Sequence, residues 1–105
     1  MPKSAIKIKL KKQVRYQRLL SGAPQTKSMR SGYVVLKPGE LIGEHSTESK
    51  EEVLVLLEGR ARVSYGIKRL LTAADSVIYI RPYTKHNVKN IGKGLLRYVY
   101  VVSPA

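Results

Sequence analysis

Residues 39–59, GELIGEHSTESKEEVLVLLEG, are the most informative stretch of the chain, because they join a turn-rich, acidic segment to its most apolar run. His45 precedes that run and Glu52 begins it. The only other histidine, His86, lies in a second turn-rich segment, RPYTKHNVKN, at residues 81–90. Two imidazoles and one carboxylate form a ligand set that suits a divalent transition metal such as Fe, Mn, Ni or Zn.

The apolar run at Glu51–Leu57 is predicted to be a strand in a sheet that is covered on both sides, because both of its faces are apolar. Side chains alternate along a strand, so Glu52, Leu54 and Leu56 share one face. We expect Leu54 and Leu56 to line the interior of a barrel beside the Glu52 carboxylate, whereas Glu51 faces the other way.

Most of the remaining chain also shows strand periodicity. In Ala5–Leu10 isoleucine and leucine alternate with lysine, which predicts an N-terminal strand with one wet face. Ser21–Ser28 reads as a loop, and Glu58-Gly59 is predicted to turn the chain into a hairpin with Arg60–Tyr65. Further strands are expected at Tyr33–Leu36, Ser76–Ile80, His86–Lys89 and Leu95–Val102. Eight or nine short strands predict an all-β sandwich or barrel.

The spacing of the two turn-rich segments resembles a known family. Gly39, His45, Glu52 and Gly59 are similar to the first motif of the cupins, in which a glycine precedes His-x-His, then Glu and a second glycine. Pro82, His86 and Asn90 are similar to the second cupin motif. The resemblance covers about residues 39–90. It implies a cupin-type double-stranded β-helix, a jelly-roll barrel, with residues 1–105 as a single domain and a basic N-terminal strand or arm over about residues 1–20.

The resemblance implies that His45, Glu52 and His86 are metal ligands, with one departure from the motif. Thr47 stands where the second histidine of the first motif is expected, and a neutral hydroxyl is a poor ligand beside imidazole. Two interpretations follow. The three remaining ligands could form a 2-His-1-carboxylate site with open positions, or the pocket could have lost its metal. Histidines on β surfaces are also commonly hydrogen-bonded structural residues.

Several other residues are candidates to line the same pocket. Arg81 and Lys85 flank His86 and could hold an anionic ligand, although ordinary surface charges are an equal alternative. Tyr98 and Tyr100 lie at alternate positions and share a face, yet as core aromatics they need no function. The candidate pocket residues are Thr47, Leu54, Leu56, Arg81, Lys85, Tyr98 and Tyr100. Asn90 is interpreted as a turn former, and Gly39, Gly43 and Gly59 as turn residues with positive φ.

The net charge is +13, and it is distributed unevenly. Residues 1–30 contain nine basic and no acidic residues, residues 31–59 two basic and six acidic, and residues 60–105 nine basic and one acidic. A cationic surface favours anionic ligands or nucleic acid, but no nucleic-acid motif accompanies the charge. High charge content without cysteine is also typical of thermophilic proteins.

Three classes of function are therefore open: a metal-dependent enzyme such as an isomerase or dioxygenase, a metal-free module that binds a small polar molecule such as a sugar, phosphosugar or carboxylate, and a nucleic-acid-associated protein. The absence of cysteine excludes disulfides and thiolate metal sites. No membrane span or signal peptide is recognisable, so we expect a cytoplasmic protein. A homodimer that uses the N-terminal arm and the final strand is also predicted.

Overall fold

The computed structural model describes residues 4–12 and 14–105, and the strands in this part of the chain number nine. They are β1 (Tyr16–Ser21), β2 (Arg30–Leu36), β3 (His45–Ser46), β4 (Lys50–Glu58), β5 (Arg60–Tyr65), β6 (Lys68–Ala73), β7 (Ser76–Ile80), β8 (Lys85–Asn90) and β9 (Leu96–Pro104). No helix occurs in these ranges, so they contain no helix that could cross a membrane. The predicted all-β class is confirmed.

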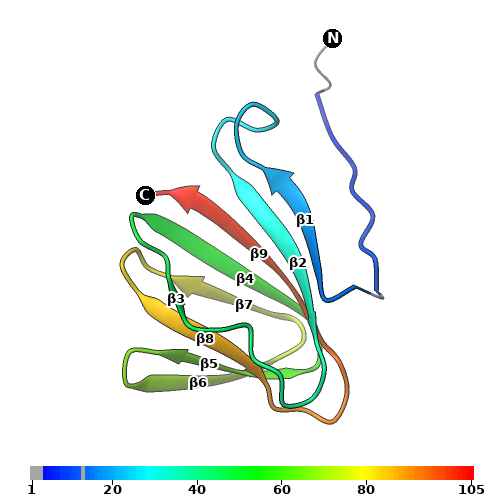
Figure 1. Cartoon of the computed structure of the whole chain (residues 1–105), viewed down its shortest axis with the longest axis vertical. Coiled ribbons are helices and arrows are strands. Elements are labelled where there is room, and N and C mark those ends of the chain that lie inside the picture. Colours follow the sequence, from blue (N-terminus) through cyan, green and yellow to red (C-terminus); the bar gives the residue numbers. More distant parts are fainter. Residues whose placement is uncertain (1–3, 13) are drawn as a thin grey trace.

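The strands form two sheets that face each other (Figure 1). One sheet has the order β1-β2-β9-β4-β7 and the other β3-β8-β5-β6. Consecutive strands repeatedly change sheet, which is the double-stranded β-helix arrangement that the sequence predicts. The core between the sheets consists of Val34, Leu36, Leu54, Leu56, Ala61, Val63, Ile78, Ile80, Val88, Leu96 and Tyr98.

Strand β4 shows the predicted alternation. Glu52, Leu54 and Leu56 are buried between the sheets, whereas Val53 and Val55 on the other face are only half-buried. The expectation that both faces are covered is therefore wrong for a single chain. Apolar side chains of the neighbouring strand β7 extend this outer surface, because Val77 is 69% and Tyr79 53% exposed.

The predicted strand at Ala5–Leu10 is also wrong. These residues belong to no sheet, and the segment runs beside β1 (Figure 1). The side chain of Gln17 holds it there, since it donates a hydrogen bond to the Lys9 carbonyl at 3.0 Å and accepts one from the Lys11 amide at 2.8 Å. The segment is therefore extended without a strand partner for its backbone, and of its alternating apolar side chains Ile8 and Leu10 are half-buried whereas Ile6 is exposed.

The hairpin predicted at Glu58-Gly59 does not form. β4 pairs with β7 and β9, whereas β5 pairs with β6 and β8, so Gly59 carries the chain from one sheet to the other. Its φ is +92°, and a Cβ here would collide with the carbonyl oxygen of Leu95. Only glycine combines that backbone conformation with this close approach. Gly39 and Gly43 have positive φ as expected.

Asn90 shapes the turn after β8, as predicted. Its side chain is fully buried and donates hydrogen bonds to the carbonyls of Leu36 and Gly94, both at 2.9 Å, while it accepts one from the Gly92 amide at 2.8 Å. The second cupin-like segment is therefore fixed to β2 at one end. This fixes the course of β8, the strand that carries His86.

Candidate metal centre

Three strands bring His45, Glu52 and His86 together. His45 on β3 and His86 on β8 are direct cross-strand partners, and their ring centroids are 4.2 Å apart. Glu52 reaches them from β4 of the facing sheet. One ligand atom from each residue can be chosen so that all three lie within 4.8 Å of one another. The structure therefore contains a possible metal-binding group at the predicted residues.

Both imidazoles are oriented by backbone carbonyls. Nδ1 of His45 lies 2.9 Å from the carbonyl oxygen of Gly43, and Nδ1 of His86 lies 3.0 Å from that of Thr84. A carbonyl oxygen can only accept, so Nδ1 carries the proton in each ring. The lone pair of a neutral ring is then on Nε2. Such contacts are the ones that commonly fix metal-binding histidines.

The Nε2 atom of His86 is buried next to the carboxylate of Glu52. It lies 3.3 Å from Glu52 Oε1, and it makes no hydrogen bond within the described part of the chain. With the proton on Nδ1, two acceptors face each other in a site where His86 is 1% and Glu52 6% exposed. This arrangement needs a cation between the two atoms, either a proton or a metal ion.

The ionisation of His86 reflects the same contact. Burial lowers the pKa of His86, but the Glu52 carboxylate and the Thr84 carbonyl together raise it above its ordinary value of 6.5. The metal-free pair therefore favours a proton on Nε2 more than an isolated histidine would.

Thr47 does not act as a ligand in this arrangement. Its hydroxyl donates to the Arg81 carbonyl at 2.7 Å and accepts a hydrogen bond from the Thr84 amide at 3.0 Å. The Thr47 amide also donates to the Thr84 carbonyl, the group that orients His86. Thr47 therefore joins the segment after β3 to the loop before β8.

The His-Glu-His group opens into a cavity of about 380 Å³ between the sheets. Of the residues predicted to line the pocket, Thr47, Leu54, Tyr98 and Tyr100 do so. Leu56 does not line it, because it is buried deeper in the core.

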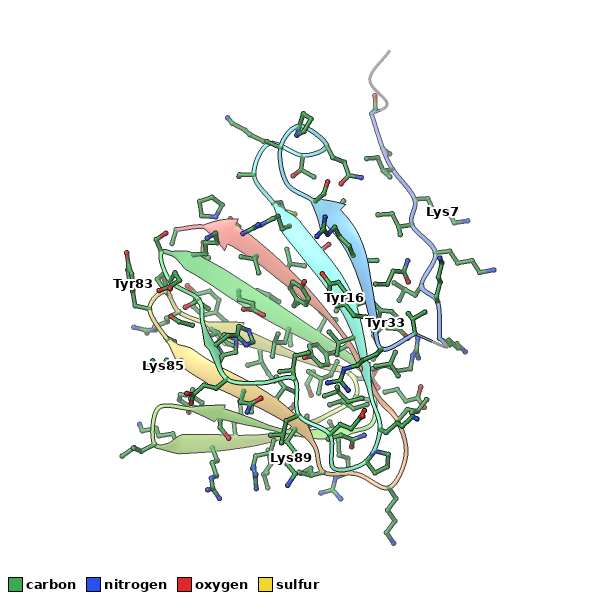
Figure 2. All side chains as sticks on the ribbon, viewed as in Figure 1. Lys7, Tyr16, Tyr33, Tyr83, Lys85 and Lys89 are labelled. Atoms are coloured by element: carbon green, nitrogen blue, oxygen red, sulfur yellow. The ribbon has the colours of Figure 1, made fainter. Side chains whose placement is uncertain are left out.

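The two predicted cations lie elsewhere. Arg81 lines a different cavity, and exposed Lys85 lies on β8 of the four-stranded sheet, across the molecule from Tyr16 (Figure 2). Lys85 immediately precedes inward-facing His86, so strand alternation directs it outward. Neither residue contributes charge to the wall of the larger cavity.

Among the described residues, the cations Arg30 from β2 and Lys50 from β4 line that cavity, together with one further carboxylate, Glu48. Lys50 shares the inner face of β4 with Glu52, so strand alternation alone could have found it. Arg30 could not be found in the same way, because only the pairing of β2 with β9 brings it beside Val102 and the cavity.

The two tyrosines of β9, Tyr98 and Tyr100, both pack in or against the hydrophobic core and both line the cavity. Tyr98 is 2% exposed, and burial, together with the charge of Glu52, raises its pKa well above the ordinary value. Tyr100 is less buried, and burial and its 2.7 Å hydrogen bond with the Tyr16 hydroxyl raise its pKa as well. Both phenols stay protonated at neutral pH, so they are available as hydrogen-bond donors.

Comparison with known proteins agrees with this architecture. The chain is 31% identical over 84 residues to a Streptomyces cyaneus protein named polyketide synthase CurC, a match that covers 77% of the chain and 54% of that relative. The chain thus spans about half the length of this relative.

Two solved structures are also similar. The cupin domain of Schizosaccharomyces pombe Cnp3 superposes with a TM-score of 0.79 at 20% identity, covering 93% of this chain and 69% of that one. A cupin 2 conserved barrel domain protein from Salinispora arenicola gives a TM-score of 0.78 at 24% identity, covering 97% and 92%. The family model described as a cupin domain matches residues 32–102. The chain therefore belongs to the cupin family.

Proposed function

We propose that His45, Glu52 and His86 hold a divalent transition metal that binds a small polar or anionic molecule in the cavity. The observation that carries this proposal is the buried Nε2 of His86, which has no hydrogen-bond partner among the described residues and faces Glu52 Oε1 at 3.3 Å. A metal ion would separate these two acceptors and use the lone pair of each.

The three side chains fit such an ion chemically. Mixed nitrogen and oxygen ligands suit Fe, Mn, Ni or Zn, and three protein ligands leave positions open for a bound molecule. When bound, the metal would act as a Lewis acid toward an oxygen of that molecule. This is the chemistry expected of an isomerase or dioxygenase-like enzyme, and it equally serves tight binding without turnover.

The chain's own side chains would position the bound molecule. Arg30 and Lys50 supply positive charge at the cavity wall, and Val34, Ile42 and Leu54 supply apolar surface. Protonated Tyr98 and the Tyr16–Tyr100 pair can donate hydrogen bonds to it. In the tyrosine pair one hydroxyl donates to the other, which leaves one O–H free to bind an anionic oxygen.

Metal content provides the test. Wild-type protein, His86→Ala, Glu52→Gln and the surface control Lys85→Ala would each be stripped, incubated with Fe(II), Mn(II), Ni(II) or Zn(II), desalted and measured by elemental analysis. We expect about one ion per chain in the wild type and in the control, and far less in the two site variants. Absence of retained metal in the wild type would contradict the proposal.

The second candidate is a metal-free binding module, in which a proton takes the place of the metal. The raised pKa of His86 favours this alternative, as does the engagement of Thr47 in backbone hydrogen bonds. Under this alternative, no metal is retained, yet ligand binding survives complete chelation.

A homodimer remains a prediction. The apolar outer surface formed by Val53, Val55, Val77 and Tyr79 supports it, because the exposed part of this surface would be covered by a second copy. Light scattering during size-exclusion chromatography would give twice the monomer mass if the prediction is correct.

A further inference from the structure

A second hollow continues from the larger cavity along the inner face of β1 and β2. It has a volume of about 250 Å³, and the two cavities share Tyr16, Arg30, Tyr100 and Val102. Arg18 is added to the wall here. A molecule bound beside the His-Glu-His group could therefore extend into this second hollow without leaving the concave surface.

The charge of the second hollow is purely positive. Arg18 and Arg30 line it, and no acidic residue of the described ranges does. Neither guanidinium makes a hydrogen bond or ion pair within residues 4–12 and 14–105, whereas Arg15 and Arg97 are paired with Glu40 and Glu58. Two unpaired guanidiniums beside a concave surface favour an oxyanion, which guanidinium binds in a forked, bidentate geometry.

The surface between the two arginines is prearranged. The Tyr16 and Tyr100 rings are stacked, with centroids 6.3 Å apart and an interplanar angle of 19°, and their hydroxyls are 2.7 Å apart. Gly32 makes room for the Tyr100 ring, because a Cβ there would lie 2.6 Å from ring atoms. The outer faces of this stacked pair are flat and apolar, and the hydrogen bond between the hydroxyls fixes their orientation.

Arg30 is also held in place by its surroundings. A Cβ added to Gly22 would lie 3.1 Å from Cγ of Arg30, so the aliphatic stem of the arginine packs closely over this glycine. Gly22 has a φ of +84°, a conformation that suits glycine. The loop between β1 and β2 thus contacts the aliphatic part of Arg30, whose side chain is exposed.

The separation from the metal-binding group follows from the strand register. Arg30 pairs with Val102, and Val102 pairs with Glu52. Arg30 and Glu52 therefore occupy one row on the inner face, two strand spacings or about 10 Å apart at the backbone. This separation accommodates one small molecule with an anionic end and a flat body.

We propose that Arg18 and Arg30 form an anion subsite that binds the carboxylate of a flat, partly apolar molecule, whose body packs against the Tyr16–Tyr100 pair and whose other end reaches His45, Glu52 and His86. This inference rests on the proposed function, which it refines by naming the class of ligand. A neutral sugar would leave both guanidiniums without an anionic partner.

The experiment uses 2-naphthoate as the probe and 2-naphthamide as its neutral counterpart, measured by titration calorimetry with the metal-treated protein. The variants are Arg18→Gln, Arg30→Gln and the control Arg69→Gln, whose exposed side chain lies on β6 of the other sheet. We expect the wild type to bind naphthoate at least about tenfold more tightly than the amide. Each site variant should weaken naphthoate binding about tenfold and leave the amide unchanged, and the control should change neither.

The inference would be overturned if the wild type failed to bind naphthoate, if it bound acid and amide with equal affinity, or if Arg69→Gln caused the same loss of binding as the two site variants. Displacement of naphthoate by an equal concentration of inorganic phosphate would show that only charge attraction holds it. This result would also overturn the inference. The metal proposal is judged separately. Arginine-dependent naphthoate binding in a protein that retains no metal would sustain the subsite and refute the metal site.

Discussion

Replacement of Thr47 by valine tests whether this residue is a structural tie or a ligand. Valine keeps the shape of threonine but removes its hydroxyl, which is buried and makes two hydrogen bonds, to the Arg81 carbonyl at 2.7 Å and from the Thr84 amide at 3.0 Å. Each hydrogen bond contributes about 1 kcal/mol to stability, and the groups left without partners add to the cost. We therefore expect Thr47→Val to lower the free energy of unfolding by about 2 kcal/mol.

The effect on metal binding should be smaller and indirect. The Thr84 carbonyl accepts a hydrogen bond from Nδ1 of His86, so greater freedom of Thr84 would leave the imidazole less precisely oriented. Loss of such a supporting contact typically weakens metal binding about tenfold or more. We expect Thr47→Val to bind metal about tenfold more weakly, with an unchanged stoichiometry of one ion per chain.

Urea unfolding followed by circular dichroism measures the stability, and competition with a chelator measures the metal affinity. An unfolding loss of about 2 kcal/mol corresponds to a fall of about 10 °C in Tm for a domain of this size. Thr47→Ser is the matched control, since it keeps the hydroxyl and loses one methyl group, about 0.8 kcal/mol. A structural role of Thr47 would be contradicted if Thr47→Val kept the wild-type unfolding midpoint, or if it lost all metal while remaining fully stable.

Two further predictions concern the strand crossover and the metal-free site. Gly59→Ala should destabilise the fold by about 3 kcal/mol, because positive φ is costly and the new Cβ would collide with the Leu95 carbonyl. Gly39→Ala, with positive φ but nothing within 4 Å of its Cβ, should lose only about 1–2 kcal/mol; equal losses in urea unfolding would contradict this. In the metal-free protein, the pKa of His86 is raised by Glu52 and Thr84 against the effect of burial, so its stabilising contribution should be fully present below about pH 6.5 and disappear as pH rises through the folded-state pKa. The difference between the urea midpoints of the wild type and His86→Gln should therefore shrink from pH 5 to pH 9. A difference that grows with pH would mean that the pKa of His86 is lowered by folding.

The sequence predicted the elements whose side chains follow a local rule. Alternation along β4 correctly placed Glu52, Leu54 and Leu56 on the inner face, because the face of a strand residue depends only on its parity. The same rule would have excluded Lys85 from the cavity, because it is the neighbour of His86 on β8, and included Lys50, because it shares the face of Glu52 on β4. The sequence alone was therefore sufficient to assign Lys85 to the outside and Lys50 to the cavity.

Other features depend on distant contacts that local patterns do not encode. The alternation in Ala5–Leu10 predicted a strand, but the backbone of this segment is held by the side chain of Gln17 and has no strand partner. Arg30 reaches the cavity only through the register of β2 with β9. The role of Thr47 likewise required the position of the loop before β8, to which it is hydrogen-bonded.

The proposed metal site requires an ion that is bound by Nε2 of both histidines and by the Glu52 carboxylate. Anomalous diffraction from crystals of the metal-treated protein, collected on both sides of the absorption edge of the metal, tests it directly. We expect one strong peak about 2.0–2.2 Å from His45 Nε2, His86 Nε2 and a carboxylate oxygen of Glu52, with each Nδ1 still bonded to its carbonyl. A map without a peak at these three side chains, or with His86 Nε2 hydrogen-bonded to Glu52 and no ion between them, would contradict the claim.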